Sequence, residues 1–282
     1  MRKRLLSLFL VLLIVLASGC IGGSNSTSTT SSQSTASSTT SHSAQIESKT
    51  TTTSQNPLET LKSSLESVEQ FTYRGKTLIH MNVTVLVSNF TQNTSISLQM
   101  IERGYIDLSS MEAAINTTTI TEPDNTTLTT LRVVKDGKTY IKTVIGPGVS
   151  SMNVTDNVSA FIWEYNPLSL AKRYIRESPD KVIKNGKTTE LTYTLGWQDV
   201  KALSILYLAV TEDTGIEVKG GRLSLIFEGE KLTRVEVEYS VVATTVVNDS
   251  LLGQMTIKIS AKGISDYEIT SINERREVEP PT

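Results

Sequence analysis

Few side chains in this chain of 282 residues suit catalysis: it holds one cysteine, Cys20, and two histidines, His42 and His80. His42 lies in a Ser/Thr-rich segment that is too polar to fold into a rigid site. His80 falls on the polar side of an alternating segment, where an exposed position is expected. Cys20 directly follows a run of small residues. These residues predict no catalytic pair and no metal site, and nothing in the sequence indicates a cofactor.

Two short motifs match parts of known enzyme sites, but both lack their companions. Gly-Lys-Thr occurs at residues 75–77, 137–139 and 186–188. A phosphate loop needs another glycine five residues earlier, where Gln70, Arg132 and Lys181 stand. Ser-x-x-Lys occurs at 169–172 and 178–181, without the Lys-Thr-Gly that accompanies it in penicillin-recognising enzymes. The sequence therefore disfavours an enzyme.

The segment before Cys20 has the parts of a secretory signal. It has a basic start at residues 2–4, an apolar stretch at 5–16 broken only by Ser7, and small residues at 17–19. This stretch is shorter than the ~20 apolar residues that a membrane-spanning helix needs. The segment resembles the lipobox of prokaryotic surface lipoproteins, with Ala17 where leucine is usual. That resemblance implies that 1–19 is a signal peptide and that Cys20 is lipidated; the alternative is a secreted protein with a stray cysteine.

Loss of residues 1–19 leaves 24 basic and 29 acidic residues, because three of the 27 basic residues are removed. An acidic chain lacks the basic face that binds nucleic acid. A single acyl chain anchors a protein only weakly, so we expect a two-chain lipid on Cys20. The sequence thus predicts a protein on the outer face of the cell membrane, attached to the membrane through its lipid. It identifies no protein partner.

Residues 20–56 form the second segment, and 22 of the 33 residues from 24 to 56 are Ser or Thr. Such a run buries too little apolar surface to fold, so we expect a disordered stalk. At ~5–6 Å × √n its ends would lie about 30 Å apart. It is either an O-glycosylated stalk or an unmodified spacer.

Sugar acceptors are frequent in the chain. The nine Asn-x-Ser/Thr sequons begin at Asn25, Asn82, Asn89, Asn93, Asn116, Asn125, Asn153, Asn157 and Asn248. Asn82 falls on the polar side of an expected strand; residues 89, 93, 125, 153, 157 and 248 fall in expected turns. Together with the export signal, these sites predict an extracellular, N-glycosylated domain. They favour an archaeal over a bacterial source.

Residues 57–282 are expected to form a single ectodomain. Cap-and-proline signals predict helices from 57 to about 70 and after Asn166-Pro167, and the apolar segment 197–210 predicts a buried helix. Alternation predicts strands at 77–87, 96–100, 223–227, 235–241 and 255–261, and hairpins at 131–144 and 182–195 that turn at Asp136-Gly137 and Asn185-Gly186. A further turn is expected at 248–253. The polar end, 277–282, is expected to fray. The fold class that follows is α+β, with a long antiparallel half-barrel sheet curved around helices.

Three patterns resemble the superfamily of lipoprotein carriers, that is, the LolA-like and LppX/LprG-like lipoproteins. They are Leu58-Glu59-Thr60-Leu61 running through Phe71 into a long strand, Asp266-Tyr267, and the tail 277–281. The resemblance loosely covers 57–282 and implies a half-open sheet that holds lipid against helices. The side chains expected to line such a cavity are Ile79, Met81, Val83, Val85, Leu98, Met100, Val235, Val237, Tyr239, Ile257 and Ile259.

Two hypotheses of function follow. The first is a lipid-anchored extracellular binding module that holds a lipid or another hydrophobic ligand. The alternative is a surface adhesion or assembly component with a solid core and no ligand. The methionines on the apolar positions suit an adaptable pocket, but they equally fill gaps in an ordinary core.

Overall fold

The structure is a computed structural model that describes residues 57–87, 90–146, 149–156, 158, 160–208, 210, 214–249 and 253–281. Of residues 248, 249 and 253 only the backbone is described. The signal segment, Cys20, the stalk and the sequons at Asn25, Asn89 and Asn157 lie outside the described residues.

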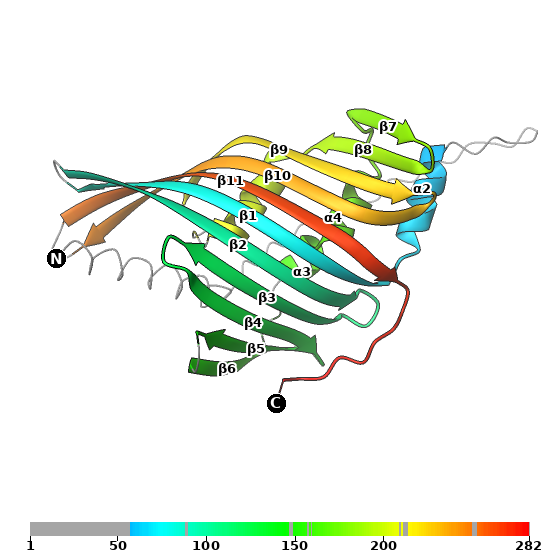
Figure 1. Cartoon of the computed structure of the whole chain (residues 1–282), viewed down its shortest axis with the longest axis horizontal. Coiled ribbons are helices and arrows are strands. Elements are labelled where there is room, and N and C mark those ends of the chain that lie inside the picture. Colours follow the sequence, from blue (N-terminus) through cyan, green and yellow to red (C-terminus); the bar gives the residue numbers. More distant parts are fainter. Residues whose placement is uncertain are drawn as a thin grey trace, which may run out of the picture.

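Eleven strands form one antiparallel sheet (Figure 1). They are β1 Gln70–Val87, β2 Phe90–Asp107, β3 Glu112–Glu122, β4 Thr126–Lys135, β5 Lys138–Ile145, β6 Val149–Thr155, β7 Lys181–Asn185, β8 Thr188–Thr194, β9 Gly215–Glu228, β10 Lys231–Asp249 and β11 Gly253–Ile272. Their order in the sheet is β6-β5-β4-β3-β2-β1-β11-β10-β9-β8-β7. The first and last strands therefore pair at its centre, and β6 and β7 are its two edges.

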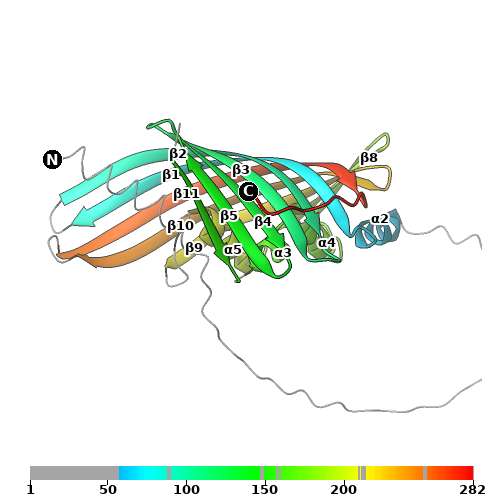
Figure 2. The ribbon, with the colours of Figure 1, turned by 90° about the horizontal axis from the view of Figure 1, so that it is seen from below.

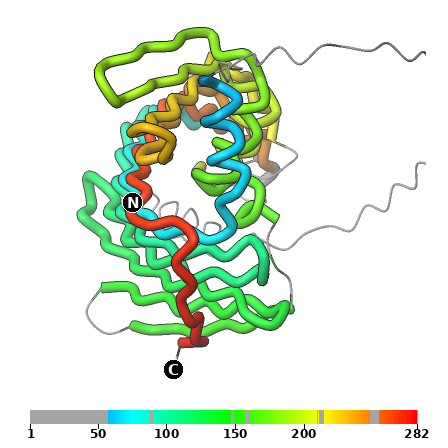
Figure 3. The backbone as a smooth tube through the Cα atoms, turned by 90° about the vertical axis from the view of Figure 1, so that its right-hand side faces the viewer, coloured from blue at the N-terminus to red at the C-terminus, as the bar shows by residue number. Residues whose placement is uncertain are grey.

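The described helices are α2 Pro57–Glu66, α3 Ala160–Glu164, α4 Pro167–Tyr174 and α5 Trp197–Leu208. The predicted helix starts at 57, 167 and 197 are confirmed. At α4 the cap is visible, because the Asn166 side chain accepts a 2.8 Å hydrogen bond from the Ser169 backbone N–H. Figures 2 and 3 show all four helices on one side of the sheet. We call that side of the sheet its helix-side face.

The predicted fold class, an α+β half-barrel curved around helices, is wrong. Strand makes up 64% of the structure and helix 17%, in a single antiparallel sheet. The helices are 5 to 12 residues long, and their main contacts with the sheet are to β9 and β10. The single sheet therefore makes up most of the structure, and the helices are short elements packed on one part of it.

Local signals identified the tight turns correctly. Asp136 and Gly137 both have positive φ (51° and 72°), as a type I′ turn requires, and Gly186 has φ 60° between β7 and β8. The predicted turns at Asn93 and Asn153 are wrong, because these residues lie within β2 and β6. Both are exposed, so a polar residue on the solvent side of a strand was mistaken for a turn residue.

The end of the chain is also ordered, contrary to the predicted fraying. Val278 is 2% exposed and packs with Tyr105 and Val133 in a small second apolar cluster. The Lys135 ammonium donates a 2.7 Å hydrogen bond to the Val278 carbonyl. Figure 1 shows this tail running from the end of β11 across the sheet toward its lower strands. Burial of Val278 thus fixes the C-terminal segment against the sheet, although its polar composition predicted fraying.

Candidate functional site

The strand register brings the predicted lining residues to the helix-side face. Ile79 on β1, for example, pairs with Leu98 on β2 and with Gly263 on β11, which in turn pairs with Tyr239 on β10. Seven of the eleven are buried in the main core: Ile79, Met81, Val83, Val235, Val237, Tyr239 and Ile259. The other four are partly buried against it: Val85, Leu98, Met100 and Ile257. That they line a ligand cavity stays a prediction.

A polar cluster, Tyr73, Glu102, Thr117 and Arg132, interrupts this apolar face. The Tyr73 hydroxyl donates to Glu102 Oε1 at 2.6 Å, and the Thr117 hydroxyl donates to Glu102 Oε2 at 3.1 Å. Arg132 lies on β4, beyond β3, and interacts with Glu102 through space. The four members lie on four consecutive strands of the sheet: Tyr73 on β1, Glu102 on β2, Thr117 on β3 and Arg132 on β4.

Three further tyrosines adjoin the cluster. The Tyr207 hydroxyl on α5 and the Tyr267 hydroxyl on β11 lie 2.6 Å apart, which joins the helix to the sheet. The Tyr239 ring stacks on the Tyr207 ring with centroids 6.4 Å apart. Within the described part of the chain, the buried Tyr239 hydroxyl has no hydrogen-bond partner. A buried unsatisfied hydroxyl is uncommon and marks a position worth testing for function.

Burial dominates the electrostatics of these groups. It raises the pKa of the Glu102 carboxyl, and the hydrogen bonds from Tyr73 and Thr117 and the charge of Arg132 offset this only in part. Burial, followed by the charge of Glu102, raises the pKa of Tyr73 well above its ordinary value. Burial lowers the pKa of Arg132, opposed by Glu102 and Tyr73. Removing these groups from water therefore favours a neutral carboxyl at Glu102.

Sequence reasoning missed the polar cluster, although a signal was present. Glu102 continues the alternation of Ile96, Leu98 and Met100, and so occupies a position expected to be apolar. A charged residue in phase with an apolar stripe is one that the fold must accommodate in its interior. The strand predicted at 96–100 ends two residues before this carboxylate, which is the next position in phase, so Glu102 was not among the predicted site residues.

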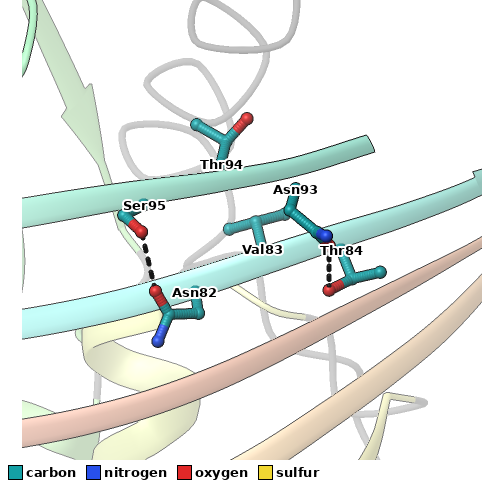
Figure 4. A pocket seen from close by; sticks show the side chains of 6 residues that line it. All are labelled: Asn82, Val83, Thr84, Asn93, Thr94 and Ser95. Carbon is teal, nitrogen blue, oxygen red and sulfur yellow. Dashed lines mark hydrogen bonds between the residues drawn. The ribbon is translucent and has the colours of Figure 1, made fainter. Parts of the chain in front are cut away.

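At the far end of β1 and β2, a shallow hollow of about 320 Å³ is lined by two complete sequons, 82–84 and 93–95 (Figure 4). They run antiparallel and bond to each other. The Ser95 hydroxyl donates to Asn82 Oδ1 and the Thr84 hydroxyl donates to Asn93 Oδ1, both at 2.8 Å. These hydrogen bonds engage the oxygen of each side-chain amide. The amide nitrogen, to which a glycan would be attached, takes no part in them.

The asparagines of five described sequons are accessible to solvent. Asn82, Asn93, Asn116, Asn125 and Asn153 are all exposed, as glycan acceptors must be. Asn125 has φ 51° in the turn between β3 and β4, which confirms the turn predicted there. Asn248, predicted to lie in a turn, instead lies near the end of β10, and the structure describes only its backbone. Modification of these residues stays a prediction.

The motifs considered for catalysis have structural roles. The Lys172 ammonium donates to the Val68 carbonyl at 2.5 Å, beyond the end of α2, while the Ser169 backbone N–H donates to the side chain of Asn166, which caps α4. His80 is exposed, and its Nδ1 lies 2.9 Å from the Ser97 hydroxyl. Across the described ranges no group of three His, Cys, Asp or Glu side chains is placed to hold a metal ion. No helix in the same ranges has the length and apolar character to cross a bilayer.

Comparisons with known proteins give slight likenesses only. No protein-family model matches the chain, and no curated protein matches it. A solved β-barrel-like protein of a domain of unknown function, DUF1849, from Brucella abortus has a TM-score of 0.24 and 9% identity, covering 73% of this chain and 100% of that one. A DUF1329 family protein from Desulfovibrio piger has a TM-score of 0.23 and 7% identity, covering 75% and 89%. Neither likeness carries an argument, and the resemblance to lipoprotein carriers and the archaeal source stay predictions.

Proposed function

We propose that this chain is a lipid-anchored extracellular module that holds a hydrophobic ligand on the helix-side face of its sheet. Export and the anchor follow from the signal segment and Cys20. The observation that supports ligand binding is that the helices cover one part of the apolar face and leave another part accessible. The helices contact mainly β9 and β10, whereas Leu98 and Met100 on β2 keep part of their surface accessible.

Partly accessible apolar residues that adjoin a core are suited to bind an apolar molecule. Met100 has a flexible thioether side chain that adapts to ligands of different shape. Burial of apolar surface stabilises a complex by roughly 25 cal/mol per Å² before the entropic cost of binding. A few such side chains are therefore enough to hold an acyl chain, and no catalytic group is required.

The test is to extract the purified native protein with organic solvent and to identify the released lipid by mass spectrometry. A lipid covalently attached at Cys20 stays with the protein. Leu98→Asp is expected to reduce recovery of bound lipid, whereas Leu86→Asp, which changes an exposed leucine, is not. Circular dichroism checks that both variants fold. Equal recovery from the two variants, or no lipid from the wild-type protein, would refute the proposal.

One observation favours the alternative, a surface assembly component. The edge strand β6 contains no charged residue, and its Val149, Met152 and Val154 are 65%, 50% and 49% exposed. Open edge strands of this kind pair readily with another strand. A photo-crosslinking residue at Met152 would capture a stoichiometric protein partner in cells if this function holds, and the same residue at Val182 on β7 is the control.

A further inference from the structure

We propose that the ligand on the helix-side face is an amphiphile with a single anionic headgroup, a carboxylate or a phosphate, and that Arg132 binds that headgroup. This inference rests on the function proposed above and specifies its ligand. Its starting point is a cation on an otherwise apolar and hydroxyl-bearing face.

In the part of the chain that the structure describes, the charge that acts most strongly on Arg132 is that of Glu102, and the two are not joined in a salt bridge. Among the described residues its guanidinium forms neither an ion pair nor a side-chain hydrogen bond, and it interacts with Glu102 and Tyr73 through space only. A guanidinium carries its charge permanently and has five N–H donors. Enclosing such a group is unfavourable unless it is paired. An anion that arrives with the ligand would supply the missing pairing.

Glu102 does not fill that role. Its two oxygens already accept hydrogen bonds from Tyr73 at 2.6 Å and from Thr117 at 3.1 Å. Burial also raises the pKa of this carboxyl, which favours its neutral form. Both Glu102 oxygens are thus engaged by hydroxyl groups, and among the described residues Glu102 forms no hydrogen bond to Arg132, which keeps its donors for a second acceptor.

The surroundings of Arg132 fit the tail of such a ligand. Arg132 pairs with Ile115 on β3 and with Ile141 on β5. Ile115 in turn pairs with Gly104 on β2, six residues from the partly accessible Leu98 on the same face. At ~3.4 Å per residue that distance is about 20 Å along the strand. That span equals the length of an extended acyl chain, which would have to pass the Tyr73 ring over Gly104 and then Glu102 and Met100 on β2 to reach Leu98.

A matched pair of probes and variants tests the inference. The full mature chain, purified in detergent, is mixed with equal concentrations of palmitate and of 1-hexadecanol, which has the same chain length and no charge. Native mass spectrometry measures the ratio of the two complexes. The variants are Arg132→Gln, the charge-preserving Arg132→Lys, and Arg103→Gln, which removes an exposed arginine from β2, separated from β4 by β3.

The wild-type protein is expected to prefer palmitate by roughly 10- to 100-fold, as a charge-assisted hydrogen bond of about 1.5–3 kcal/mol implies. Arg132→Gln abolishes the preference, Arg132→Lys retains part of it, and Arg103→Gln leaves it unchanged. Equal binding of both probes, or an undiminished preference in Arg132→Gln, overturns the headgroup assignment while the proposed binding function stands. Failure of both probes to bind the wild-type protein overturns the binding function as well.

Discussion

At the scale of single residues, three glycines leave room for the tyrosine rings of the helix-side face, because a glycine has no Cβ. Gly104 lies opposite Tyr73, Gly75 opposite Tyr267, and Gly263 opposite Tyr239. A Cβ on these glycines would lie 2.2, 2.7 and 2.4 Å from the facing ring, respectively. Each ring therefore covers the backbone of the neighbouring strand, as aromatic residues do across strand glycines. In this position Tyr73 reaches the carboxyl of Glu102.

Gly104→Ala tests this arrangement. The new methyl group displaces the Tyr73 ring and with it the bond to Glu102, so we expect a loss of about 1–3 kcal/mol in the free energy of unfolding. Gly220→Ala is the control, because a Cβ there meets nothing within 4 Å. Urea unfolding measures both. If the two variants are equally stable, the close contact between Gly104 and Tyr73 has been misread.

Glu102 predicts a pH dependence of stability. Burial raises its pKa in the folded protein. A group whose folded pKa exceeds its unfolded pKa stabilises the fold at a pH below the unfolded value, and that contribution is lost as the pH rises through the folded value. The contribution of Glu102 to stability should therefore decrease between acid and neutral pH, by about 1.4 kcal/mol for each unit of pKa shift; the lowered pKa values of Asp107 and Glu238 act in the opposite direction.

The matched measurement compares Glu102→Gln with Glu122→Gln over the same pH range. Without an ionisable group at 102 this loss disappears, so from acid to neutral pH the unfolding free energy of Glu102→Gln falls less, or rises more, than that of the wild-type protein. Glu122 is exposed, and its replacement leaves the slope as in the wild-type protein. An unchanged slope in Glu102→Gln would show that this carboxyl ionises in the fold as it does in the unfolded chain.

At the scale of elements, the two sheet edges differ in how they are protected. β7 carries Lys181 and Lys184, and charged lysines disfavour pairing with another strand. β6 carries no charge, and its exposed residues are apolar or uncharged polar. Asn153 lies within β6 and is exposed. A glycan on it would shield that edge, so the protein without glycans should expose an edge able to pair.

Met152→Lys tests the exposed edge. In protein made without glycosylation, we expect self-association that increases with concentration, and this substitution should suppress it. Val182→Lys, on the edge that already carries lysines, should have no effect. Analytical ultracentrifugation measures both. Self-association that persists in Met152→Lys would exclude pairing through β6.

Elements with local signals could be predicted, and those defined by long-range pairing could not. Asn166-Pro167 and Asp136-Gly137 specify a helix start and a turn within a few residues. β6 was missed because its polar residues, exposed at a sheet edge, look like those of a loop. The order of the strands was also beyond reach, since β1 pairs with β11 across almost the whole described chain.

At the scale of the whole molecule, the same limit explains the fold class and the site. Alternation indicated which residues share a face, and the lining residues do share one. It did not indicate that eleven strands form one sheet, so the weight of the helices was overestimated. Glu102 and Arg132 share one face of the sheet, separated by the single strand β3, because β2, β3 and β4 are consecutive in the sheet. No spacing in the sequence records that proximity.

The most direct measurement of the central claim, that an apolar ligand binds the helix-side face, uses the methionines as reporters. Met81 and Met100 lie on that face, whereas Met111 and Met152 are 48% and 50% exposed at a turn and at the sheet edge. The mature chain is labelled with ¹³C at the methionine methyl groups and titrated with palmitate. The account predicts that the Met81 and Met100 signals shift and saturate while those of Met111 and Met152 stay in place. Unchanged Met81 and Met100 signals, or equal shifts at all four residues, would contradict it.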